Sequence, residues 1–393
     1  MQRKIASAIS ILVVTLTVVG CSKSGSSYSP ELSPKSIFST ADSCYLKSNL
    51  TNDGNLGFPI SNRYLKSTGI INLAIIYTTY SDAIGDDRAF KEYDDTQFAN
   101  VEKYYSFSSY GKLSVKLITN DKYYKIAKNS GSYNLEAMDS SSRFGEVIKD
   151  AVQAAKNDYD FSKIDAILVV MPSTVKARDL GATGIDISIG GKKFSQAISA
   201  AFINPSNGIQ VKPKFLVHEI GHNFGLIHPF SESSNAWSVM HWEQNPASDI
   251  FGWEKFILKW IDDSQVDCVD SSVTASITDY VEATGIRSGN TKLLVVKISD
   301  SQALVIESRR KSELDDLAPN EEGVLVYKVD ANLKSDYDAV KLKTNYSIYK
   351  NFNGQSLLVG TLKSGESIKS DGIEIKIMKN DVNGDFVKLS RVK

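Results

Sequence analysis

The sequence predicts an α+β fold in which a mixed α/β region is followed by a mostly β region. Two observations support this expectation. Between residues 69 and 224, continuous apolar runs of strand length alternate with segments whose apolar residues repeat at helical spacing. After residue 262, short alternating runs are separated by turn residues. With 393 residues, 42% of them hydrophobic and 23% charged, the chain has ordinary globular composition and enough apolar material for a substantial core.

The first region is expected to contain three strands and two helices. The strands are placed at 69–79, 165–171 and 197–203, because continuous apolar runs suit strands that are buried on both faces. Helical spacing places the helices at 144–155 and 215–224. The order strand, helix, strand, strand, helix is typical of an α/β or α+β core.

The second region is expected to be a β-sandwich. Its alternating runs lie at 292–298, 303–307, 324–329, 373–378 and 386–389. Asn353-Gly354 and the acidic tip from Asp381 to Asp385 are typical of hairpin turns. Acidic tips can also bind calcium, but this one has few ligands and no ligand periodicity. A plain hairpin is therefore the favoured interpretation, and a structural Ca²⁺ is the alternative.

The N-terminus is expected to be an export signal. Arg3 and Lys4 precede an apolar run, 5–19, that is too short to span a bilayer comfortably. Val18-Val19-Gly20-Cys21 resembles the bacterial lipoprotein box, whose cysteine is acylated and becomes the mature N-terminus. The resemblance favours lipid anchoring to the outer membrane, at the cell surface or the periplasmic face. The alternative is an ordinary signal peptide with an incidental cysteine and a secreted protein.

These features divide the chain into four segments. A signal peptide (1–20) precedes a lipid-anchored tether and N-terminal segment (21–66), a catalytic-type domain (67–262) and the β-sandwich domain (263–393). Ser22 to Pro34 is rich in Ser, Gly and Pro and is expected to be flexible. The net charge of −1 gives no general attraction to nucleic acid or anionic membrane, so we expect no nucleic-acid partner and contact with the membrane only through the lipid. We also expect a monomer.

Three of the four histidines lie within eleven residues, at His218, His222 and His228. Positions i and i+4 share one face of a helix, so the first two can present imidazole nitrogens to one metal ion. Gly225 can end that helix in a left-handed conformation and return His228 to the same ion. Three histidines leave one position of tetrahedral zinc open, which is typical of a catalytic site.

Glu219 directly follows the first of these histidines and is the expected general base, which would later return its proton to a leaving amine. One Zn²⁺ is the expected cofactor, and it would lower the pKa of a bound water to about 7. The alternative without a metal is that His218 and His222 are a pair of core histidines on a helix. An inactive metal-binding descendant is a further alternative, but such a protein normally lacks the glutamate.

The run His218-Glu219-Ile220-Gly221-His222-Asn223-Phe224-Gly225-Leu226-Ile227-His228 is similar to the H-E-x-x-H-x-x-G-x-x-H motif of the metzincin zinc metalloproteases. The resemblance implies a metzincin-like α/β protease core. It also implies a Met-turn at Met240, whose apolar thioether would form the floor of the site. Some metzincins have a tyrosine two residues later, where this chain has Trp242, which has no oxygen to donate. His241 is interpreted as a wall residue rather than a group that aids the transition state.

Further stretches resemble the immune inhibitor A and gametolysin-like secreted peptidases, which are metzincins. They lie at 74–82, 104–113, 237–240, 253–260, 307–310 and 323–327. Lys259 departs from the usual glycine of that family, and Pro229 resembles another metzincin branch. The family resemblance implies a zinc metalloendopeptidase that acts on proteins or peptides.

In such enzymes the substrate is expected to add as a strand to a sheet edge, here either 183–189 or 195–201. The alternative functions are a zinc hydrolase of cell-wall peptides and an inactive surface-binding adhesin or scaffold. Cys44 and Cys268 are expected to form a disulfide, because exported proteins meet oxidising conditions. The alternative makes Cys44 a latency thiolate on the zinc, as in some metzincins, although its flanking residues do not match their propeptide motif.

Overall fold

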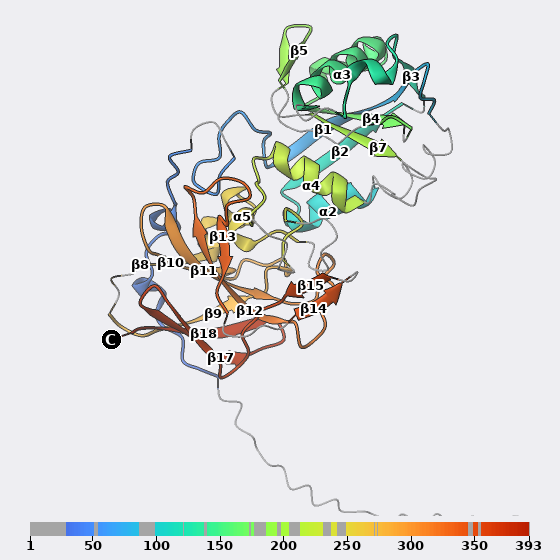
Figure 1. Ribbon diagram of the computed structural model, residues 1–393. Helices are drawn as coiled ribbons and strands as arrows, with labels where there is room; N and C mark the ends of the chain where they lie inside the picture. Colours follow the sequence, from blue (N-terminus) through green and yellow to red (C-terminus); the bar gives the residue numbers. More distant parts are fainter. Residues whose placement is uncertain are drawn as a thin grey trace, which may run out of the picture.

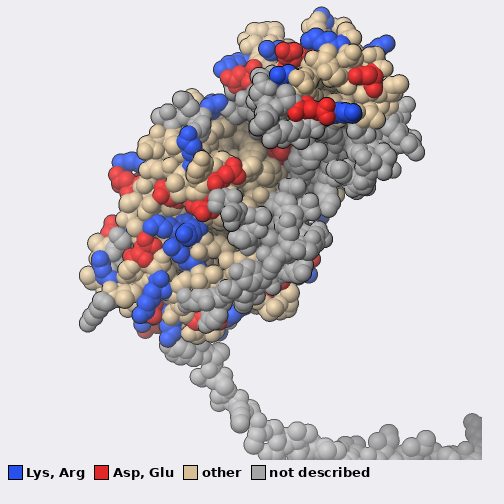
Figure 2. Space-filling model, in the orientation of Figure 1, with Lys and Arg blue, Asp and Glu red and all other residues tan. Residues whose placement is uncertain are grey.

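The computed structural model describes residues 29–50, 54–85, 99–120, 122–136, 140–172, 174–176, 186–194, 198–203, 213–230, 237–241, 249–270, 272, 274–344, 349–352 and 355–392. The expected signal peptide, Cys21 and Trp242 lie outside these ranges. Within them, no helix has the length and apolar character that a membrane crossing requires. Figure 2 shows basic and acidic side chains intermixed over the visible face, in keeping with the net charge of −1.

The first region is built on a parallel sheet in the order β2-β1-β4-β7, with β3 also paired to β1. Its strands are β1 (Gly69–Thr79), β2 (Leu113–Thr119), β3 (Tyr124–Lys125), β4 (Ala166–Pro172) and β7 (Ile198–Ile203). In register, Ile75 lies between Thr119 and Leu168. The three predicted strands are confirmed to within one residue at each end. Strands β1 and β4 are buried on both faces, which explains their continuous apolar runs.

Helices cover both faces of this sheet (Figure 1). Helix α3 (Ser140–Ala155) lies on one side, and α2 (Ala99–Ser108) and α4 (Pro213–Asn223) lie on the other. The predicted helices at 144–155 and 215–224 are therefore confirmed, although each begins earlier than expected. Helix α2 was not predicted. Its Tyr105 hydroxyl donates a hydrogen bond to the carbonyl of Val217 in α4 (2.7 Å) and thereby joins the two helices.

The second region contains two sheets with the orders β13-β12-β11-β10-β8 and β16-β17-β18-β9. The strands are β8 (Val266–Asp270), β9 (Ile277–Glu282), β10 (Leu293–Lys297), β11 (Gln302–Arg309), β12 (Gly323–Asp330), β13 (Val340–Leu342), β16 (Ser367–Ser370), β17 (Ile373–Asn380) and β18 (Gly384–Arg391). The five predicted strands are confirmed. The pairing is antiparallel except between β8 and β10, which are parallel. Side chains of both sheets form one apolar cluster.

Smaller elements complete the fold. They are α5 (Gly252–Ile257), β5 (Ile187–Ile189), β6 (Lys192–Phe194), β14 (Tyr349–Phe352), β15 (Gln355–Leu358) and 3-10 turns at Lys35–Ile37, Ala41–Cys44, Ser130–Tyr133, Phe161–Lys163 and Asp263–Gln265. Strands β14 and β15 pair antiparallel on either side of Asn353-Gly354, which lies outside the described residues. At the acidic tip, Asp381 donates its backbone N–H to Gly384 (2.8 Å), and the Asp385 carboxylate pairs with Arg310 (2.6 Å).

In the sheet β13-β12-β11-β10-β8, neighbouring side chains along a strand belong to two different apolar cores. In β10, Leu294 and Val296 belong to the cluster between the two sheets. Leu293 and Val295 belong to the large core that also contains the α/β sheet and α4. One apolar core therefore runs across residue 262, where the sequence suggested a domain boundary.

The N-terminal segment is held against the second region. Ser33 donates its backbone N–H to Thr278 (2.8 Å) and accepts the Thr278 N–H on its hydroxyl oxygen (2.9 Å). Two hydrogen bonds therefore join β9 to the end of the segment that the sequence assigned to a flexible tether. Cys44 and Cys268 form a disulfide with a Cα–Cα distance of 5.8 Å. Leu46 and Leu56, further along, are fully buried.

Candidate metal centre

Helix α4 carries His218 and His222 on one face, and its C-terminal turn brings His228 back to them. The helix ends in a Schellman motif, in which the N–H of Gly225 bonds to the carbonyl of His222 (2.9 Å) and the N–H of Leu226 to that of Gly221 (3.2 Å). Gly225 has φ +90°, and a Cβ there would lie 2.8 Å from the ring of Tyr64. Glycine is thus required both by the backbone and by the N-terminal segment that packs on this turn.

The three imidazoles converge. Their Nε2 atoms are 3.0 Å apart between His218 and His228, and 3.1 Å apart in each of the pairs that include His222. For comparison, zinc-to-histidine bonds of 2.0–2.1 Å in a tetrahedron place two nitrogens roughly 3.3 Å apart. The group can hold a metal ion, and it is the only such cluster of three or more His, Cys, Asp or Glu found in the described part of the chain.

The hydrogen-bond partners of the three Nδ1 atoms determine the tautomer of each ring. Nδ1 of His218 lies 2.8 Å from the Val239 carbonyl oxygen, and Nδ1 of His222 lies 2.8 Å from that of Leu226. Nδ1 of His228 lies 3.0 Å from a carboxylate oxygen of Asp336. Each partner can only accept, so each ring carries its proton on Nδ1 and turns a bare Nε2 lone pair inward. Three lone pairs at this separation repel one another unless a cation lies between them, so the donor set fits a metal.

Burial keeps the first two imidazoles neutral. It lowers the pKa of His218 to about 4, although the hydrogen bond to Val239 acts in the opposite direction. Burial also lowers the pKa of His222 well below its usual value, and the neighbouring His218 and His228 add to this effect. A metal ion binds neutral imidazole, so these two rings need not lose a proton at neutral pH before they bind one.

Met240 lies against α4, where the sequence resemblance places a Met-turn. It is fully buried, and a Cβ added to Gly221 would lie only 2.4 Å from its sulfur. The turn is held by Ser238, which adopts φ 64° and accepts the Met240 N–H on its hydroxyl oxygen (3.2 Å). The side chain of Met240 therefore supports the helix one residue before His222.

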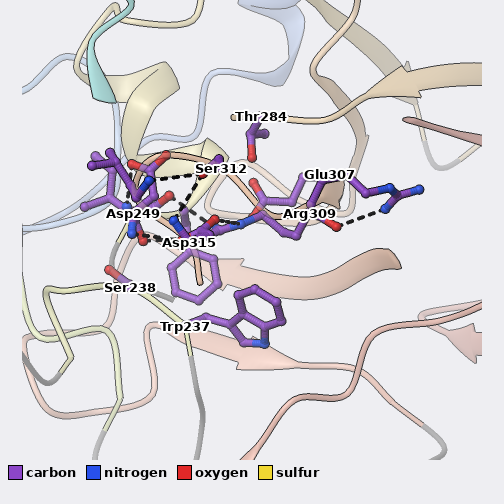
Figure 3. A network of polar contacts seen from close by, with 12 residues as sticks. Trp237, Ser238, Asp249, Thr284, Glu307, Arg309, Ser312 and Asp315 are labelled. Atoms are coloured by element: carbon purple, nitrogen blue, oxygen red, sulfur yellow. Dashed lines mark hydrogen bonds and ion pairs between the residues drawn. The ribbon is translucent and has the colours of Figure 1, made fainter. Parts of the chain in front are cut away.

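A buried polar network lies next to this turn (Figure 3). Arg309 pairs with Asp315 (2.7 Å) and Glu307 (3.1 Å), and its guanidinium lies over the Trp237 ring, 4.9 Å from the centroid. The Trp237 indole N–H donates to the Val359 carbonyl (2.7 Å), so the turn that contains Met240 is anchored to the second region. Sequence analysis placed Glu307 and Arg309 in a stretch of family resemblance but did not predict this network, because spacing along the chain does not show that charged side chains are buried together.

The remaining predicted site residues are placed as follows. Glu219 follows His218 on α4 and is partly exposed. His241 packs edge-on against Phe230, with ring centroids 4.9 Å apart, and burial lowers its pKa to about 4. The structure does not include it in the metal-binding group. Asp336 was missed entirely, since it lies 108 residues from the histidine that it contacts.

No family model and no curated protein sequence matches this chain. Among solved structures, wild-type OgpA from Akkermansia muciniphila is similar in two crystal forms, each with a TM-score of 0.34 and 12% identity. These alignments cover 70% and 75% of this chain and 91% and 96% of OgpA. Catalytically inactive OgpA in complex with an O-glycopeptide, glycodrosocin, gives a TM-score of 0.32 at 12% identity and covers 86% of this chain and 97% of that one. Likenesses at this level establish neither a shared family nor a shared activity.

Proposed function

We propose that this protein is a zinc-dependent endopeptidase of the metzincin type. The observation that carries the proposal is the set of three inward-facing Nε2 atoms, 3.0–3.1 Å apart, with an acceptor fixed on every Nδ1. Structural zinc sites usually have four protein ligands, whereas this cluster has three. The side chain of His228 is 35% exposed, so the cluster is open to solvent on that side.

The residues of the chain have separate tasks in this proposal. Zinc, when bound, would polarise the scissile carbonyl and make water a better nucleophile near neutral pH. His218, His222 and His228 would hold the ion, and the acceptors on their Nδ1 atoms would keep the rings in the binding tautomer. Glu219 would take a proton from the attacking water and return it to the nitrogen of the leaving amine. Met240 would keep α4, and thus two of the ligands, at a fixed height above the core.

A peptide substrate would add to the edge of the sheet beside α4. Strand β7 contacts α4, and it is the last strand of the sheet order β2-β1-β4-β7 in the described residues. The other candidate, β5, instead pairs with β6 in a separate two-stranded hairpin. An extended peptide alongside β7 would form main-chain hydrogen bonds there and bring its scissile bond toward the histidines. The proposal therefore favours 195–201 over 183–189 as the substrate-binding edge.

The test combines metal content with cleavage. Purified wild-type protein should contain one zinc per chain and cleave members of a peptide library, and a chelator should abolish cleavage reversibly. Glu219→Gln should retain zinc but lose cleavage by at least 100-fold, since a general base contributes about 10²–10⁴-fold. The matched control is Glu146→Gln on α3, whose side chain is 64% exposed, and its activity should equal that of the wild type.

Other results would identify the alternatives. Cleavage of cell-wall peptides without cleavage of proteins would identify a zinc hydrolase of a different substrate class. If the wild type cleaves neither substrate, an adhesin or scaffold becomes the better interpretation. If Glu219→Gln cleaves as well as an active wild type, the proposed general-base role of Glu219 is wrong.

We further propose that the protein is exported and anchored to the bacterial outer membrane through lipid on Cys21. Support comes from the lipoprotein-box resemblance of residues 18–21. Metabolic labelling with a fatty-acid analogue should mark the wild type and leave Cys21→Ala unlabelled. Equal labelling of the two proteins would contradict the proposal.

A further inference from the structure

The third histidine is held by a loop of the second region. The backbone N–H of His228 donates to the hydroxyl of Ser335 (3.1 Å), and its carbonyl accepts the N–H of Asp336 (3.0 Å). The next residue, Pro229, accepts the N–H of Val340 on its carbonyl (3.0 Å). Ser335 and Asp336 lie in the connection between β12 and β13, so the backbone of the ligand loop is tied to the β region.

The side chains repeat this connection. The Nδ1 atoms of His218 and His222 face main-chain carbonyls of the first region, at Val239 and Leu226. Nδ1 of His228 instead faces a carboxylate oxygen of Asp336, at 3.0 Å. Among the three rings, His228 therefore differs in two ways. Its Nδ1 partner is an ionisable side chain, and that side chain belongs to the second region.

We propose that Asp336 is the positioning residue of the third metal ligand, so that the β region completes the metal centre. This inference rests on the proposed function, in that the triad binds zinc. A carboxylate that accepts from Nδ1 fixes the tautomer and the orientation of the ring, and makes Nε2 a stronger ligand. The helix holds the other two rings, but His228 lies beyond the helix and needs this external support.

The backbone of Asp336 has a left-handed conformation. Asp336 adopts φ 65° and Asp338 adopts φ 55°, a left-handed region that aspartate tolerates better than most residues. The side chain of Asp336 is 60% exposed. Solvent screens its charge at that exposure, so its influence on His228 comes from the direct hydrogen bond rather than from the field of the carboxylate.

The first test measures zinc affinity by competition with a chromophoric chelator. Asp336→Gly removes the carboxylate without backbone strain, since glycine adopts φ near 65° freely. Its zinc affinity should fall by about 10–100-fold, the usual effect of losing such a partner. Asp336→Asn keeps an accepting oxygen without the charge and should show a smaller loss. The inference is overturned if Asp336→Gly binds zinc within twofold of the wild type.

The matched control is Asp371, in the turn between β16 and β17. It also has a left-handed backbone, φ 51°, but its carboxylate pairs with Lys328 (2.7 Å) rather than with a histidine. Asp371→Gly and Asp371→Asn should bind zinc as the wild type does. Thermal unfolding of the metal-free proteins should show that all four variants are folded. An equal loss of zinc affinity in the Asp371 variants would overturn a specific role of Asp336.

A second readout uses the metal-free protein and so separates the inference from the proposed function. Long-range ¹⁵N–¹H NMR spectra of the wild type should show His228 protonated at Nδ1, as for His218 and His222. In Asp336→Gly the His228 ring should become a mixture of tautomers, whereas His218 and His222 should keep their proton on Nδ1. An unchanged His228 ring would overturn the positioning role whether or not the protein binds zinc. Conversely, a wild type that binds zinc but cleaves no peptide would contradict the endopeptidase alone.

Discussion

Glu254 is a buried carboxyl group beside the turn that contains Met240, and the described residues provide hydrogen-bond partners for only one of its two oxygens. It is fully inaccessible to solvent. Its Oε2 accepts the N–H of Phe251 (2.7 Å) and the hydroxyl of Ser238 (3.0 Å), whereas its Oε1 has no hydrogen-bond partner among the residues that the structure describes. Burial raises the pKa of Glu254 to about 8, and nearby Glu307 adds to the effect. At neutral pH the group is therefore a neutral acid in the folded protein.

This pKa makes stability depend on pH in a defined direction. In the unfolded chain the carboxyl ionises near its usual pKa of 4.5, and in the folded protein near 8. Its contribution to stability is thus fully present below pH 4.5 and is lost as pH rises through 8. A difference of one pKa unit corresponds to about 1.4 kcal/mol, so this shift corresponds to about 4–5 kcal/mol as an upper figure.

Glu254→Gln removes the ionisation and keeps the shape. Glutamine at this position of α5 can still accept the N–H of Phe251, as in a capping box. Near pH 4.5 the variant should match the wild type in its free energy of unfolding. By pH 8 to 9 it should be the more stable protein, by up to about 4 kcal/mol.

The assay is urea denaturation at several pH values between 4.5 and 9, with chelator present so that metal binding does not contribute. Glu146→Gln, which changes an exposed glutamate of α3, is the control and should follow the wild type at every pH. If Glu254→Gln also follows the wild type across this range, the carboxyl is not held neutral by its surroundings and the reasoning is refuted.

Two other substitutions test the packing around the site. Gly221→Ala should lower the free energy of unfolding by about 1–2 kcal/mol despite its better helix propensity, because its Cβ would lie 2.4 Å from the Met240 sulfur. Adding Met240→Ala should remove this penalty, and simple additivity in urea denaturation would disprove the contact. Arg309→Met leaves Glu307 and Asp315 buried without their cation, and should cost about 3–5 kcal/mol in the same assay. A cost below about 1 kcal/mol would show that the network is not a stabilising unit.

The sequence was sufficient for the parts of the fold that repeat a local pattern. The continuous apolar runs at 69–79 and 165–171 are strands, because both faces of β1 and β4 are covered. Helix α2 was missed because its apolar side is made by tyrosines such as Tyr104 and Tyr105, whose hydroxyls weaken the pattern. Ser33 was assigned to a flexible tether because composition does not show main-chain hydrogen bonds to a distant strand.

The same division holds at the candidate site. His218, His222 and His228 could be grouped from spacing alone, because helix geometry and one glycine bring them together. Asp336 could not be found in this way, since its contact depends on how the β12–β13 connection packs against the ligand loop. Nor does sequence spacing show that one core extends across residue 262. Tertiary packing decides both features, and no local signal records it.

The most direct test of the account is X-ray absorption spectroscopy at the zinc edge on wild-type protein loaded with one equivalent of zinc, with His228→Ala in parallel. The wild type should show three histidine nitrogens at about 2.0–2.1 Å and one further oxygen ligand from solvent. The variant should bind zinc more weakly and show only two histidine nitrogens. Zinc bound without imidazole ligands, or a spectrum that His228→Ala leaves unchanged, would contradict the claim that these three rings form the metal site.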